Sequence, residues 1–194
     1  MSVRPDPAAA EFAAAVESIR AIRGRPDVVI HEIAAPEGLA PFAVALAADV
    51  MPGSHDEDSV LGVGRFVLLF DPAGSPEWDG RFRVISFAQA PMEVQIGEDP
   101  FLADVVWSWL TDALDELGAH YHAEAGTATK TISTGYGELA AHGVAAQVEL
   151  RASWTPADAD LAAHVEAWTD LVAMLAGMPP RYDAPPSVDS RRRP

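Results

Sequence analysis

The stretch from Gly126 to Gly137 holds the side chains whose types and spacing best suit binding chemistry: three glycines, several hydroxyls and one lysine. Small residues let a backbone approach a ligand closely, and hydroxyl and ammonium groups donate hydrogen bonds to an anion or a peptide. The Gly-Lys-Ser/Thr order of a phosphate-binding loop is missing, and no strand-to-helix turn is indicated. The candidate ligand-binding residues are Thr127, Thr129, Lys130, Ser133 and Thr134.

A purely structural interpretation of this stretch stays open, because threonine favours strands and a glycine-rich turn would follow the strand. On a strand, alternation puts Thr127, Thr129 and Ser133 on one face. Lys130 and Thr134 then lie on the other face. Lys130 is the only lysine in the chain, so its substitution would separate the two interpretations.

A weak candidate for metal binding is the pair His120 and His122. The two residues are separated by one position, so on a strand both rings face the same side and could meet one metal ion. The sequence places no third ligand at a fixed distance from them. We therefore expect no metal and no cofactor.

Catalytic motifs are missing from the sequence. The chain contains no cysteine, which excludes thiolate nucleophiles and every zinc or iron–sulfur site built on sulfur. No serine lies in a Gly-x-Ser-x-Gly elbow, and the abundant carboxylates single out no catalytic pair. The balance favours a protein that is not an enzyme.

Composition limits the class of protein. The chain has 194 residues, 49% of them apolar, and no apolar window long enough to span a membrane. The N-terminus lacks the continuous apolar core of a secretory signal, so we expect a globular cytoplasmic protein. With 29 acidic and 13 basic residues the formal charge is −16, which repels phosphate backbones and argues against direct binding of nucleic acid.

The clearest predicted helix is Asp99–Gly118, with a capping Asp, a Pro in its first turn and a terminating Gly. Its apolar residues recur at three- and four-residue spacing, as expected for a helix lying on a sheet. Trp107 lies beyond that stripe, beside Leu110 and Leu114, so the apolar face is wider than one contact surface requires. We therefore treat Trp107, Leu110 and Leu114 as a candidate interface with a second partner.

Hydrophobic periodicity divides the rest of the chain. Helices are predicted at 8–23 and from about 155 or 158 to 177, and strands at 27–34, 41–50, 64–70, 81–89, 120–134 and 145–154. Residues 1–7, a polar loop at 52–59 and a tail at 179–194 are expected to be unstructured. The remainder, 8–178, is predicted to form a single domain.

The resulting order αββββαββα indicates an α+β domain, with an antiparallel sheet of about six strands and three helices packed on it. Two segments, Gly64–Gly118 and Thr127–Gly177, have matching residues in their helices, which suggests a duplicated ββα unit. The alternative is that two sheet-covering helices of equal length converge on one pattern.

Four segments carry a resemblance to a known family: Glu32–Val50, Phe87–Pro91, Asp99–Leu110 and Gly126–Leu139. They resemble an actinobacterial family known only as domain of unknown function 3000. The resemblance implies a small cytoplasmic protein and carries no catalytic residue, cofactor or substrate. The element order also resembles the secretion-chaperone-like fold, including the YbjN-like proteins, whose members are commonly dimeric and bind other proteins. The additional strand before the central helix departs from that fold.

Three functions remain to be compared. The leading hypothesis is a non-enzymatic protein-interaction module, chaperone-like or adaptor-like, that forms a homodimer or binds a partner protein through a helix face or an open sheet edge. The alternative is a small-molecule or anion-binding protein, with or without catalysis, whose site is the Gly126–Gly137 stretch. A third is an adaptor that binds a basic enzyme of RNA metabolism and not the RNA itself.

Overall fold

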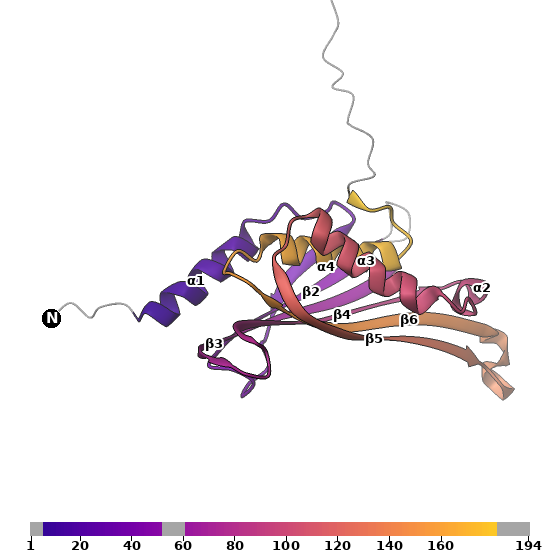
Figure 1. Cartoon of the computed structure of the whole chain (residues 1–194). Helices are drawn as coiled ribbons and strands as arrows, with labels where there is room; N and C mark the ends of the chain where they lie inside the picture. Colours follow the sequence, from indigo (N-terminus) through magenta and orange to yellow (C-terminus); the bar gives the residue numbers. More distant parts are fainter. Residues whose placement is uncertain (1–5, 52–60, 182–194) are drawn as a thin grey trace, which may run out of the picture.

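The computed structural model describes residues 6–51 and 61–181. It forms two layers, a six-stranded sheet and a layer of helices (Figure 1). In chain order the elements are α1 (Pro7–Arg20), β1 (Val28–Ile33), β2 (Phe42–Val50), β3 (Gly62–Ser75), β4 (Gly80–Met92), α2 (Val94–Gly97), α3 (Leu102–Glu116), β5 (Tyr121–Thr134), η1 (Gly137–His142), β6 (Val144–Pro156) and α4 (Ala162–Leu175).

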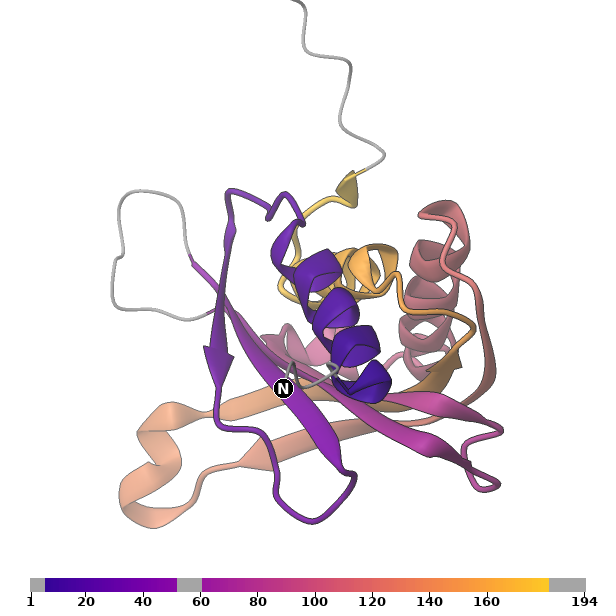
Figure 2. The same ribbon diagram turned by 90° about the vertical axis from the view of Figure 1, so that its left-hand side faces the viewer.

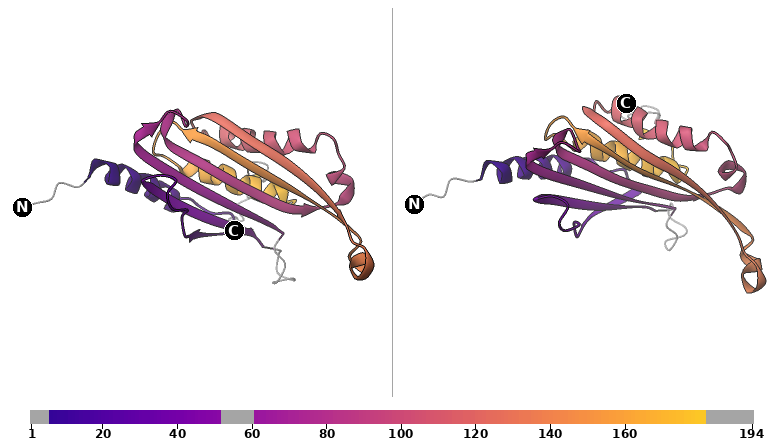
Figure 3. Two further views of the ribbon diagram at one scale, coloured as in Figure 1. Left: turned by 90° about the horizontal axis from the view of Figure 1, so that it is seen from below. Right: turned by 60° about the horizontal axis from the view of Figure 1, so that its bottom comes forward.

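The sheet has the order β1-β2-β3-β4-β6-β5, and every neighbouring pair is antiparallel. After β4 the chain crosses through α2 and α3 to the far edge, forms β5 there, and returns as β6 beside β4. The predicted α+β class and six-stranded antiparallel sheet are therefore confirmed. The hairpin of β5 and β6 projects beyond the helices, with η1 at its tip (Figure 3).

The described residues contain five helices and not the three that were predicted. The three long ones lie where the periodicity indicated them. The additional two, α2 with four residues and the 3-10 turn η1 with six, are too short to produce a periodic apolar pattern. The element order therefore differs from the prediction only by these short elements.

Strand ends also differ from the prediction. The connection expected at 71–80 is shorter than predicted, because β3 and β4 pair again at Ser75 and Gly80 after an irregularity that follows Phe70. The last strand, β6, continues to Pro156, which delays the start of the final helix to Ala162.

The C-terminal ends of α3 and α4 form at the two glycines where the sequence predicted them. Gly118 has φ 72° and Gly177 has φ 82°, a backbone conformation that side chains with a Cβ disfavour. The amide of the residue after each glycine donates a hydrogen bond of 2.9 Å to the carbonyl of the residue five positions earlier, as in a Schellman motif. The start of α3 is later than predicted, and Asp99 instead accepts a hydrogen bond of 2.8 Å from the amide of Phe101.

All three long helices lie on one face of the sheet, and no helix of the described residues covers the other face (Figure 2). Alternation along the strands puts Phe66, Leu68 and Val84 under the helices, where they are fully buried. We call the uncovered side the helix-free face. It faces the viewer when the molecule is seen from below (Figure 3).

The centre of the helical layer is α4 and not α3, the helix that the sequence predicts most clearly. Eleven of the fourteen residues of α4 are buried, because it lies between the other two long helices and on the strands beneath them. Because α4 lies close to β3, position 64 must be a glycine: a Cβ there would lie 2.8 Å from the ring of Trp168.

Several predictions fall partly outside the described residues. The predicted loop at 52–59 and most of the predicted unstructured ends, residues 1–5 and 182–194, lie there. Within the described part, Asp6 caps α1 by accepting a hydrogen bond of 3.1 Å from the amide of Ala8, and Pro7 is the first helical residue.

Among the described helices, none is long and apolar enough to cross a membrane.

Candidate functional site

Strand β5 forms one edge of the sheet. Twelve of its fourteen residues pair with β6 on one side, and no strand of the described residues pairs with the other side. Between Ala125 and Thr134 its only charged side chain is that of Lys130. A bulge interrupts the pairing between His122 and Ala125, and Ala123 has φ 52° there. The regular part of the edge therefore begins at Ala125.

Two side-chain hydrogen bonds link β5 to α3 and to the residues just before it. The Lys130 ammonium donates a hydrogen bond of 2.6 Å to the carbonyl of Asp99, just before the helix begins. The Tyr121 hydroxyl donates 3.1 Å to a carboxylate oxygen of Asp115, near the end of the helix. Burial, together with this hydrogen bond, raises the pKa of Tyr121 to about 12. The amine of Lys130 is thus already used in holding the fold together.

The five predicted ligand-binding residues are divided between two faces. Lys130 and Thr134 point toward the helical layer, and Thr127, Thr129 and Ser133 lie on the helix-free face, as the register with β6 requires. The structure therefore does not bring the five together around one ligand. Only Thr127 joins a larger hollow, which is described below.

The candidate interface on α3 needs a correction. Leu110 and Leu114 are each 1% exposed, so neither offers a surface to another molecule in this fold. Trp107 is half-buried and packs on β5, where a Cβ at Gly126 would lie 2.4 Å from its ring. The wide apolar face that suggested an external partner is instead covered by β5, the strand that follows α3, and by α4, which is distant in sequence.

The two histidines proposed as weak metal ligands lie in different surroundings. His122 lies at the bulge, where its Nε2 is 2.8 Å from the carbonyl oxygen of Asp79. His120 precedes the strand. Within residues 6–51 and 61–181, no three His, Asp or Glu side chains gather as a metal site would require.

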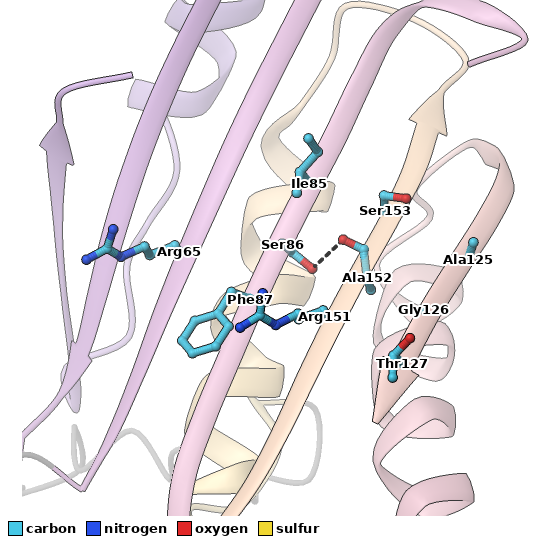
Figure 4. A pocket seen from close by; sticks show the side chains of 10 residues that line it. All are labelled: Arg65, Ile85, Ser86, Phe87, Ala125, Gly126, Thr127, Arg151, Ala152 and Ser153. Carbon is cyan, nitrogen blue, oxygen red and sulfur yellow. Dashed lines mark hydrogen bonds between the residues drawn. The ribbon is translucent and has the colours of Figure 1, made fainter. Parts of the chain in front are cut away.

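The helix-free face contains an open hollow of about 740 Å³ (Figure 4). The residues that line it come from β3, β4, β6 and β5: Arg65, Ile85, Ser86, Phe87, Ala125, Gly126, Thr127, Arg151, Ala152 and Ser153. The lining combines two arginines and the hydroxyls of Thr127 and Ser153 with the apolar surfaces of Ile85 and Phe87. It includes no acidic residue.

Strand register aligns the main side chains of the hollow in one row. Arg65 on β3 lies opposite Phe87 on β4, which lies opposite Arg151 on β6. Thr127 on β5 ends the row beside Arg151. We call Arg65, Phe87 and Arg151 the arginine row. It places one aromatic ring between two guanidinium groups on an exposed sheet face.

Local contacts orient Arg151. Its guanidinium carbon lies 5.6 Å from the centre of the Phe87 ring, within the range of a cation–π contact. Its Nε donates to the Glu149 carboxylate, and this hydrogen bond raises the pKa of Arg151. These two contacts hold the guanidinium group beside the ring.

The neighbouring Arg83 on β4 has a structural role. Its guanidinium donates to the Ser153 hydroxyl at 2.6 Å, the Thr155 hydroxyl at 3.0 Å and the carbonyl of Ala123 at 2.9 Å. Partial burial lowers its pKa. Arg83 therefore ties β4 to β6 and to the bulge of β5, and its donors are engaged.

Sequence reasoning missed the arginine row. Each of its members stands at a position that alternation assigns to the polar side of its strand, and that signal was available. The row itself depends on β4 lying beside β6, and these strands are separated in the chain by two helices and β5.

The fold and the site define a class: a two-layer α+β domain whose described helices cover one face of an antiparallel sheet, with β1 and β5 as the two edges of that sheet. The chain belongs to the family described as protein of unknown function DUF3000, whose model matches residues 8–184. The resemblance to that family is therefore confirmed. No curated protein and no solved structure matches the chain.

Proposed function

We propose that this protein is a non-enzymatic protein-interaction module that associates by strand pairing at the free edge of β5, with a second copy of itself as the first partner. The observation that supports this proposal is the exposed edge from Ala125 to Thr134, which has no pairing partner among the described residues. Unpaired N–H and C=O groups along an edge are a template for another strand.

The regular part of the β5 edge, which begins at Ala125 after the bulge, lacks the other usual devices that prevent pairing. Proline is missing from it, and its one lysine is held by the carbonyl of Asp99. The opposite edge of the sheet, β1, is only six residues long and carries His31 and Glu32. A short, charged edge is a poor template, so β5 is the better docking strand.

Two copies of β5 suit each other in an antiparallel pair about a two-fold axis at Thr129. In that register Thr127 faces Thr131 of the second copy, and Lys130 faces Ala128, so no like charges lie opposite each other. The chain carries a formal charge of −16. An edge without acidic side chains from Ala125 onward is a place where two such chains meet with little repulsion.

Cysteine cross-linking tests this pairing, because the chain has no natural cysteine. Opposed residues of an antiparallel pair have Cα atoms roughly 4.5–5.5 Å apart, which a disulfide can bridge. We expect Thr129→Cys to form a covalent dimer under mild oxidation. Glu37→Cys, on an exposed loop, is the matched control and should stay monomeric.

Light scattering on the unmodified chain completes the test. Thr129→Lys would place two ammonium groups opposite each other, so we expect it to turn a dimer into a monomer while the circular dichroism spectrum is retained. A wild-type chain that is monomeric at every concentration, together with equal cross-linking of both cysteine variants, would refute the proposal.

The setting of this function is part of the proposal. We expect a cytoplasmic actinobacterial protein, and the likeness in element order to secretion-chaperone-like proteins agrees with a dimer that binds other proteins. The alternative function, binding of an anion by the Gly126–Gly137 stretch, is supported less well, because Lys130 already bonds to Asp99. Among the candidate residues of that stretch, only Thr127 lines the hollow together with Arg65 and Arg151.

A further inference from the structure

Arg65 of the arginine row carries positive charge that the described part of the fold does not use. Five of the arginines in the described part form ion pairs with acidic residues of the chain: Arg20, Arg25, Arg81, Arg151 and Arg181. Arg65 forms no hydrogen bond or ion pair with any residue of 6–51 or 61–181, although acidic residues outnumber basic ones 29 to 13. Its guanidinium group lines the hollow and is exposed.

Arg151, the second arginine of the row, uses only part of its guanidinium group in hydrogen bonds to the described residues. Its bond to Glu149 uses Nε, and within the described residues its two Nη groups have no hydrogen-bond partner. The Arg151 side chain is 70% exposed, so the outer edge of its guanidinium group faces solvent. An exposed ion pair of this kind is weak, so an incoming carboxylate can share or replace Glu149.

The shape of the hollow favours an extended chain over a small molecule. Small ligands bind in concave sites that bury most of their surface. This hollow lies on a sheet face that no described helix covers, and Phe87 and Ile85 present apolar surface there (Figure 4). A peptide lying across the strands would cover the ring and meet both arginines.

We infer that the hollow binds an acidic peptide segment of a partner protein, in which one apolar residue is flanked by carboxylates two positions before and two positions after it. Residues at such positions point to the same side of an extended chain. The apolar side chain lies on Phe87, and the two carboxylates bind Arg65 and Arg151. This inference is independent of the pairing at β5.

The dimensions agree with this motif. The strands of Arg65 and Arg151 are separated by β4, so they lie two strand spacings apart, or roughly 10 Å. Carboxylates four positions apart in an extended peptide are separated by roughly 13 Å. The length of the two arginine side chains covers the difference. Each guanidinium group can hold its carboxylate with two parallel hydrogen bonds.

Single-stranded nucleic acid is the competing ligand for a face with arginines and an aromatic ring. Tracking a phosphate backbone requires a continuous path of cations, whereas the hollow offers two arginines, and Arg83 is engaged with Ser153 and Thr155. The charge of the whole chain also opposes a polyphosphate.

Peptide selection tests the inference without knowledge of the natural partner. A phage library of random twelve-residue peptides is selected on the full-length wild-type protein, and enriched peptides are then measured by fluorescence anisotropy. The test variant is Arg65→Ala with Arg151→Ala. The matched control is Arg20→Ala with Arg23→Ala, which removes the same charge from an exposed part of the chain outside the hollow.

We expect enriched peptides to share the pattern acidic–x–apolar–x–acidic. The test variant should bind them at least about tenfold more weakly, because two charge-assisted contacts are lost, and the control should bind them as wild type does. Phe87→Ala should remove the preference for the central apolar residue. Peptides without acidic residues, equal binding by the test variant, or no enrichment would overturn the inference, as would tighter binding of a labelled oligouridine than of any peptide.

Discussion

At the scale of single residues, His164 shows how burial changes the chemistry of a side chain. It lies inside α4, 1% exposed, and its Nδ1 accepts a hydrogen bond of 3.0 Å from the indole of Trp154. Burial lowers its pKa to about 4, because the charged form loses its hydration. His164 is thus a neutral part of the core.

Acid should destabilise the fold through this residue. The folded pKa of about 4 lies below the ordinary value of 6.5, so between these pH values the unfolded chain binds a proton that the folded chain does not. The free energy of unfolding should be fully retained above pH ~6.5 and fall by about 3 kcal/mol as the pH drops to ~4. Urea unfolding of wild type and His164→Gln at several pH values measures this, and parallel pH curves would contradict it.

The carboxylate of Asp170 is a second buried polar group. It is 0% exposed, and one of its oxygens accepts 3.1 Å from Arg25, whose guanidinium group also bonds to Asp27 at 2.9 and 2.7 Å. The same oxygen lies 3.4 Å from Nε of Arg181. The cluster joins α4 to the segment after α1 and to the end of the described chain. Arg25 holds the pKa of Asp27 below its usual value.

Removing Arg25 should be costly. Arg25→Ala leaves Asp170 buried with a weaker partner, and we expect a loss of about 3–5 kcal/mol in the free energy of unfolding. Adding Asp170→Asn should recover part of this loss, because no unpaired charge then remains buried. Arg20→Ala, on the exposed side of α1, is the control and should change little. Additive losses in the double variant would count against a direct interaction.

At the scale of elements, two glycine–tryptophan contacts show how the helices are seated. Trp168 of α4 covers Gly64 on β3, and Trp107 of α3 covers Gly126 on β5. Each helix thus lies on the first strand of the other predicted ββα unit. An alignment of the two predicted units without a gap pairs Trp168 with Trp109, but the residue in the equivalent contact is Trp107, two positions earlier. Duplication of the unit stays a hypothesis.

Gly126 should tolerate no larger residue. A Cβ there would lie 2.4 Å from the Trp107 ring and 2.9 Å from the carbonyl oxygen of Arg151, so the helix or the edge strand must move. We expect Gly126→Ala to lower the free energy of unfolding by about 1–3 kcal/mol. Gly24→Ala is the control, because a Cβ there meets no atom within 4 Å. Equal stability of the two variants in urea would show that α3 can move away from β5 at little cost in free energy.

At the scale of the whole molecule, all the long helices lie on one side of the sheet, and no described helix covers the other face (Figure 2). The two surfaces proposed to bind partners differ in chemistry, because Lys130 is the only charged side chain of β5 from Ala125 to Thr134, whereas the hollow contains two arginines. We therefore expect the edge to accept a strand without close positive charge and the hollow to prefer carboxylates.

Local sequence determined the types of the long elements, both glycine helix ends and the side of each strand that a residue occupies, because these depend on periodicity and on single-residue backbone preferences. Only the tertiary structure decided that β5 is the edge, that α4 is central and that Lys130 bonds to Asp99. It also brought Arg65, Phe87 and Arg151 into one row. These features depend on which distant strands pair, and the alternating pattern of one strand carries no information about its neighbour.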